Sequence, residues 1–134
     1  MRQAEDGDTP QPGTVYIAPS DTHLVIGIDC RLELLRSPPV RFQRPSADVL
    51  FESLAKHVGG AAVVIVLSGM GSDGADGAVA VKGAGGRVMA QDEASAEYFG
   101  MPGSAIATGA VDRVLPVGEI GAALSDMAAS GTPA

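Results

Sequence analysis

The fold of this chain is decided by residues 61–77, AAVVIVLSGMGSDGADG. An unbroken apolar run from Ala61 to Leu67, rich in β-branched residues, is typical of a strand buried on both faces in a parallel sheet. The glycines that follow allow a sharp turn, and the Ala/Val-rich segment from Ala75 to Val81 favours a helix. We therefore predict a strand, a tight loop and a helix.

The loop of this unit is the first candidate functional site. In open α/β sheets, ligands bind outside the carboxyl ends of the strands, which is where we expect Met70 to Asp73. Asp73 has two candidate roles there. As a helix N-cap it would accept hydrogen bonds from unpaired amides, and as a catalytic acid it would orient a histidine, as in a hydrolase triad. The two roles are compatible, and the residues alone leave both open.

An alternative interpretation of the same loop is a dinucleotide site. Gly69 to Gly74 matches G-x-G-x-x-G between a strand and a helix, and Asp92 ends the next apolar run, where an acid would bind the ribose. Asp73 opposes this interpretation, since its carboxylate would face the pyrophosphate at the helix N-terminus. No clear series of further βαβ repeats follows. Dinucleotide binding is therefore kept as the alternative function.

Composition and charge restrict the classes of partner. A share of 46% hydrophobic against 19% charged residues, over 134 residues, indicates one globular domain with a core. A net charge of −7 without a Lys/Arg cluster argues against nucleic acid. No apolar run approaches the ~20 residues that cross a bilayer, and the first residues do not resemble a signal sequence, so we expect a cytoplasmic protein without membrane insertion. Cys30 stands alone in an apolar context, which predicts a small buried residue.

The first 60 residues read as a β-rich appendage and a helix. Residues 1–12 are polar with two prolines, so we expect an extended lead-in that is poorly ordered at its free end. Three closely spaced β-like runs, at residues 14–18, 23–28 and 31–35, predict antiparallel hairpins. Ser46 is the predicted N-cap of a helix over residues 47–55 that ends near Gly59 and Gly60.

The segments after residue 83 continue the α/β pattern. We predict strands at residues 87–91 and 111–115, a helical turn from Pro102 to Thr108, and a last helix over residues 117–128. Residues 129–134 have the composition of a disordered tail. The predicted fold class is thus a doubly wound α/β fold with a mostly parallel sheet and an N-terminal antiparallel hairpin appendage.

The chain offers few partners for a catalytic acid. It contains no G-x-S-x-G nucleophile elbow. His23 begins a predicted hairpin strand and is interpreted as a hydrogen-bonded surface histidine, and His57, near a helix end, complements the helix dipole. Neither histidine has a metal-ligating neighbour at the spacing that zinc requires, so we expect no metal site.

Six motifs, taken in order along the chain, resemble the CheB-type methylesterase domain, the chemotaxis protein-glutamate methylesterase. They are GTVYIAP at 13–19 with His23-Leu24, RPSADVLF at 44–51, LSGMGSDGA at 67–75, QDE at 91–93, GMP at 100–102, and GAVD at 109–112 leading to Leu115-Pro116. Each motif is weak alone, but their order is highly specific. The resemblance covers roughly residues 3–127.

The resemblance implies a doubly wound α/β fold and a hydrolytic reaction. Family members hydrolyse glutamate methyl esters on the cytoplasmic helices of chemoreceptors, and some deamidate glutamine, with a Ser-His-Asp triad and no cofactor. By position in LSGMGSDG, Asp73 resembles the triad acid. Met70 resembles the residue whose backbone N–H contributes to the oxyanion hole, a role that depends on the amide and not on the side chain.

The family's nucleophilic serine and catalytic histidine both precede the part that aligns with this chain. We therefore expect residues 13–128 to be the C-terminal portion of a methylesterase domain, inactive alone, with a missing N-terminal segment or a receiver domain as further partners. A non-catalytic module that binds chemoreceptors is a second alternative function.

Overall fold

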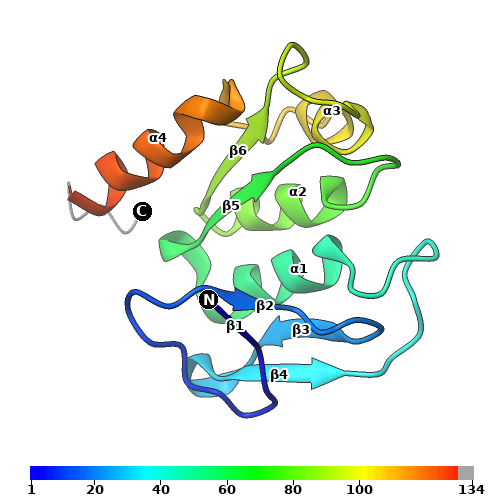
Figure 1. The fold of residues 1–134 in the computed structure, drawn as a ribbon, viewed down its shortest axis with the longest axis vertical. Coiled ribbons are helices and arrows are strands. Elements are labelled where there is room, and N and C mark those ends of the chain that lie inside the picture. The colour runs from blue at the N-terminus through cyan, green and yellow to red at the C-terminus, as the bar shows by residue number, and fades with distance from the viewer. Residues whose placement is uncertain (130–134) are drawn as a thin grey trace.

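The computed structural model describes residues 1–129, so the predicted tail lies, apart from Ala129, outside the described residues. Its main sheet has three parallel strands in the order β5-β6-β7 (Figure 1). Their bounds are Val63–Val66 for β5, Arg87–Gln91 for β6 and Arg113–Leu115 for β7. The predicted strands are therefore confirmed within a few residues at each end.

Helices cover both faces of this sheet. α1 (Ala47–His57), α2 (Ala75–Gly83) and α3 (Gly100–Ala107) contribute to one apolar core with β5 and β6, and α4 (Val117–Ala129) packs on the opposite face (Figure 1). A short 3₁₀ turn, η2 (Gly59–Ala61), leads from α1 into β5. The arrangement confirms the predicted doubly wound α/β class.

The two faces of β5 are covered unequally. Val64 and Val66 are buried against the helices, whereas Val63 and Ile65 are half-buried next to α4. The sequence predicted full burial on both faces, and the structure shows it on one. Among residues 1–129, only α4 contributes helical side chains to the second face, which explains the difference.

The hairpin appendage is confirmed in part. β3 (His23–Ile26) and β4 (Leu32–Leu35) pair in antiparallel register, and their inner face packs on α1 opposite α2 (Figure 1). The third run, β2 (Tyr16–Ile17), was wrongly assigned to a hairpin, because it pairs in parallel with β1 (Arg2–Gln3).

The lead-in explains that error. It folds back along β4, where the N–H of Gly7 donates to the Leu32 carbonyl and the Leu32 N–H donates to the Asp8 carbonyl. Ala4 is buried in the small core under the hairpin. Much of this segment is therefore hydrogen-bonded to the appendage, which its polar composition did not indicate.

The prediction for Cys30 was also wrong, since its side chain is exposed. The turn η1 (Ile28–Cys30) joins β3 to β4, and Asp29 and Cys30 both have positive φ, at 62° and 56°. The apolar context of Cys30 belongs to the strands on either side. The tight turn itself projects into solvent.

Asp112 links α2 to β6 through hydrogen bonds from both elements. Its carboxylate accepts hydrogen bonds from Lys82 and from the Val88 N–H, at 2.8 Å for the latter. Burial raises the pKa of Asp112, but these bonds and the charges of Lys82 and Arg87 outweigh burial and lower the pKa below its ordinary value.

A lowered pKa in the folded state means that Asp112 stabilises the fold above its unfolded pKa, and that this contribution is lost as the pH falls through the folded value. In urea unfolding, Asp112→Asn should cost at most about 1 kcal/mol near neutral pH, because the pair is partly exposed. The difference from wild type should shrink as the pH falls below about 4. A difference that stays constant with pH would contradict this account.

Candidate active site

Two loops meet at the carboxyl edge of the main sheet, one after β5 and one after β6. The N–H of Gly69 donates to the Tyr98 carbonyl at 3.0 Å, and the Met101 N–H donates to the Gly69 carbonyl at 2.9 Å. A Cβ atom at Gly100 would lie 2.9 Å from the Gly71 carbonyl oxygen, so the backbones approach closely there. The loop that carries Met70 and Asp73 is thus held by a second loop.

Asp73 lies in this site, buried with 8% of its surface exposed. Its Oδ1 accepts hydrogen bonds from the Ser46 hydroxyl at 2.8 Å and from the Asp48 N–H at 3.0 Å, and its Oδ2 accepts one from the Ala47 N–H at 2.7 Å. The amides of Ala47 and Asp48 open α1 and have no partner within that helix.

Asp73 therefore caps a helix, but not the helix that follows it. The N-cap of α2 is Gly74, whose φ of 100° suits glycine. The capping role inferred from the sequence is corrected accordingly: Asp73 caps α1, whose own N-cap residue, Ser46, makes no side-chain cap. The partners lie 25 to 27 positions away in the sequence, beyond the reach of local patterns.

The carboxylate of Asp73 keeps one acceptor position. An ionised carboxylate offers about four lone-pair sites, and among residues 1–129 two hydrogen bonds reach Oδ1 and one reaches Oδ2. The unused position is on Oδ2. A rigidly held carboxylate with a free acceptor site is the feature that orients the Nδ1–H of a catalytic histidine.

Asp48 is a site residue that the sequence did not reveal. Its side chain is 3% exposed, and Oδ1 accepts hydrogen bonds from the N–H groups of Gly74 at 3.0 Å and Gly77 at 2.7 Å, at the start of α2. Burial raises the pKa of the Asp48 carboxyl and the charges of Asp73 and Asp76 raise it further, partly offset by the two N–H donors. In a sequence, a carboxylate in the first turn of a helix indicates only a favourable interaction with the helix dipole, so this role of Asp48 has no local signal.

Met70 is exposed in the same loop, with 70% of its surface open to solvent. Its backbone N–H makes no hydrogen bond to any group of residues 1–129. An oxyanion hole needs backbone donors of this kind, free in the resting protein and close to the reacting group. The structure thus leaves the Met70 amide available.

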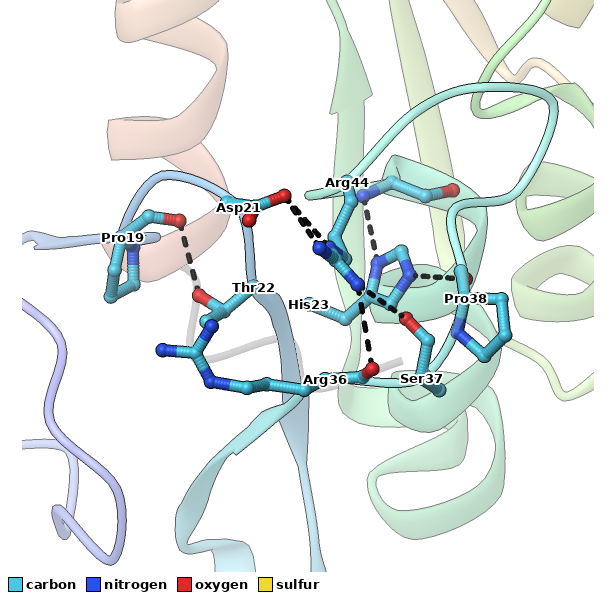
Figure 2. Close-up of polar contacts among 9 residues, drawn as sticks. Pro19, Asp21, Thr22, His23, Arg36, Ser37, Pro38 and Arg44 are labelled. Carbon is cyan, nitrogen blue, oxygen red and sulfur yellow. Dashed lines mark hydrogen bonds and ion pairs between the residues drawn. The ribbon is translucent and has the colours of Figure 1, made fainter.

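His23 is buried, which corrects the prediction of a surface histidine. The Ser46 N–H donates to its Nδ1 at 3.2 Å, so the ring proton is on Nε2. The Nε2–H donates to the Pro38 carbonyl at 3.0 Å (Figure 2). Arg44, in the same segment between β4 and α1 as Pro38, forms an ion pair with Asp21 (Figure 2). Both ring nitrogens are used, so His23 is a structural histidine and not a base.

The structure also bears on the dinucleotide interpretation. A pyrophosphate would need the free amides at the start of α2, but those of Gly74 and Gly77 are bound by the Asp48 carboxylate. Asp92, the candidate ribose ligand, accepts hydrogen bonds from the N–H and hydroxyl of Ser95. The Asp48 carboxylate thus occupies the amides that a pyrophosphate would need, and Asp92 is engaged within its own loop.

We therefore predict that NAD and NADP leave the melting temperature of the chain unchanged, because neither binds the folded state. Thermal unfolding over a nucleotide titration measures this, with an NAD-dependent dehydrogenase as the positive control. A saturable rise in melting temperature with micromolar affinity would instead support the dinucleotide site.

Within residues 1–129, no three His, Cys, Asp or Glu side chains are grouped so that they could hold a metal ion. No helix in that range is long and apolar enough to cross a membrane.

Fold and site together define a class: doubly wound α/β domains with a buried carboxylate on a strand-to-helix loop at the carboxyl edge of the sheet. Comparison with known proteins refines this class. The family model of the CheB methylesterase matches residues 1–124. The chain belongs to the CheB methylesterase family.

Relatives and a solved structure agree with this assignment. The chain is 53% identical to the protein-glutamate methylesterase/protein-glutamine glutaminase 1 of Myxococcus xanthus, over 96% of the chain and 38% of that protein. It is 50% identical to the corresponding protein of Bordetella parapertussis, over 90% of the chain and 35% of that protein. The crystal structure of the Thermotoga maritima CheB methylesterase catalytic domain superposes with a TM-score of 0.89 at 38% identity, covering 93% of the chain and 68% of that domain.

The chain thus spans little more than a third of the length of these two curated relatives.

Proposed function

We propose that this chain forms part of the catalytic domain of a cytoplasmic protein-glutamate methylesterase, which hydrolyses glutamate methyl esters on chemoreceptors and deamidates glutamine there. The observation that carries the proposal is Asp73, a buried carboxylate held by three hydrogen bonds with one acceptor position left on Oδ2. The names of the relatives supply the substrate class.

In this proposal Asp73 is the acid of a Ser-His-Asp triad, and the serine and histidine come from outside this sequence. The serine hydroxyl attacks the ester carbonyl while the histidine accepts its proton and passes it to the leaving methanol. Asp73 holds the imidazole in the required tautomer and stabilises its charged form. Water then hydrolyses the acyl-enzyme and yields the glutamate carboxylate.

Met70 would act in the same reaction through its backbone. The tetrahedral intermediate carries a negative charge on the former carbonyl oxygen, and fixed N–H donors stabilise that charge. The amide of Met70 is free among residues 1–129 and lies three positions before Asp73. No step of this reaction requires a metal or a cofactor.

A chimeric domain tests the proposal. In the chimera, this chain replaces the matching 68% of the Thermotoga maritima catalytic domain, which then supplies the remaining segments. We expect the chimera to release methanol from methylated receptor, and the chain alone to release none. A folded chimera that binds a receptor fragment without releasing methanol would instead favour a non-catalytic interaction module.

A further inference from the structure

The N-termini of α1 and α2 exchange their capping carboxylates. Asp73, from the loop before α2, accepts hydrogen bonds from the N–H groups of Ala47 and Asp48 at the start of α1. Asp48, from the first turn of α1, accepts hydrogen bonds from the N–H groups of Gly74 and Gly77 at the start of α2. Each helix is therefore capped by a residue that the other one positions.

Neither helix has a side-chain cap of its own. Ser46 occupies the N-cap position of α1, but its hydroxyl donates a hydrogen bond to Asp73 and accepts none from the amides of the helix. Gly74 occupies the N-cap position of α2 and has no side chain to offer. The positive ends of two helix dipoles meet at the two carboxylates. The N–H donors there only partly offset the burial and the neighbouring charges that raise the pKa of Asp48.

We propose that Asp48 is a positioning residue for Asp73. Asp48 accepts hydrogen bonds from the amides of Gly74 and Gly77, just after Asp73, and so fixes the turn that orients the Asp73 carboxylate. Because only 3% of its surface is exposed, Asp48 itself touches no substrate. The catalytic consequence rests on the proposed function of Asp73. The structural coupling between the two carboxylates does not.

Amide hydrogen exchange in the 134-residue chain tests the coupling. The first amides of a helix have no intrahelical partner, so protection of the Ala47 N–H reports its bond to Asp73. In Asp48→Ala, protection of the Ala47 amide should fall about fivefold or more, as expected for the loss of a cap, although Ala47 does not bond to the changed carboxylate. Asp48→Asn retains an acceptor oxygen and should restore most of the protection.

Two further variants separate coupling from general destabilisation. Asp112→Ala removes a carboxylate that accepts a hydrogen bond from the Val88 N–H elsewhere in the fold. This substitution should not selectively lower the protection of the Ala47 amide from exchange. Because coupling is reciprocal, Asp73→Ala should lower protection of the Gly77 amide, a measurement that holds even if Asp48→Ala fails to fold. Unchanged Ala47 protection in Asp48→Ala, or unchanged Gly77 protection in Asp73→Ala, overturns the proposal.

Kinetics of the chimera test the catalytic consequence. Asp48→Ala should lower kcat by about 10- to 100-fold with KM nearly unchanged, because a small displacement of a catalytic group costs that much, and Asp48→Asn should recover most of the rate. If Asp73→Asn slows the enzyme while Asp48→Ala does not, positioning by Asp48 is wrong and the proposed function stands. If Asp73→Asn has no effect, the proposed function fails, and amide exchange still decides whether the carboxylates are coupled.

Discussion

Asp73→Asn is expected to lower kcat of the chimeric methylesterase by about 10⁴-fold, the loss that the same change causes in a serine-protease triad. Asparagine keeps the shape of the side chain, but its neutral amide cannot stabilise the imidazolium or enforce the required histidine tautomer. The amide nitrogen also replaces one acceptor oxygen, so either the bond from the Ala47 N–H to Oδ2 or the bond from the Asp48 N–H to Oδ1 is lost. Methanol release at saturating methylated receptor gives kcat directly.

The matched control is Asp76→Asn. Asp76 is a carboxylate three positions along the chain, in the first turn of α2, with 62% of its side chain exposed and an ion pair to Arg41. Its replacement should leave kcat within a few-fold of wild type, since an exposed pair of this kind contributes little. If Asp73→Asn also hydrolysed the ester at a near-wild-type rate, Asp73 would be a capping residue alone.

Gly77→Ala is expected to destabilise the fold strongly. An added Cβ would lie 2.5 Å from the Phe51 Cβ and 3.1 Å from the Asp48 Cα, atoms that move only with the α1 backbone. α1 and α2 would have to separate, which weakens both the core around Phe51 and the hydrogen bond from Gly77 to Asp48. Overpacking typically costs about 1–3 kcal/mol, and we expect the upper end of that range or more.

Gly83→Ala is the control for this experiment, because a Cβ there meets no atom within 4 Å. At the last position of α2, alanine should be neutral or stabilise by up to about 1 kcal/mol through its higher helix propensity. Urea unfolding of both variants and of wild type gives the two differences. A Gly77→Ala variant as stable as wild type would show that α1 and α2 do not depend on this close contact.

The parts of the fold that the sequence predicted depend on local patterns. The apolar run to Leu67 and the glycines after it determine β5, its loop and α2 within a few residues, and the β3–β4 hairpin follows from alternating short runs. The parallel pairing of β1 with β2 joins residues 14 positions apart through a returning lead-in. No local pattern indicates such a contact.

The candidate site divides in the same way. The motif around Asp73 was visible in the sequence, because glycines and a carboxylate between a strand and a helix indicate a tight turn with a candidate functional residue. The role of Asp48 was not visible, because the amides that donate hydrogen bonds to it lie 26 and 29 positions away in the sequence. Burial of His23 likewise depends on the loop with Pro38 and on Ser46, which become neighbours only after folding.

In the proposed enzyme, α1 holds Asp73 so that its Oδ2 receives a catalytic histidine. A crystal structure of the chimera would show whether this contact forms. We predict a histidine Nδ1 within about 2.6–3.2 Å of the Asp73 Oδ2, with the bonds from Ser46, Ala47 and Asp48 retained. An Asp73 carboxylate bonded only to α1, with the histidine oriented by another group, would show that Asp73 is a capping residue and not the triad acid.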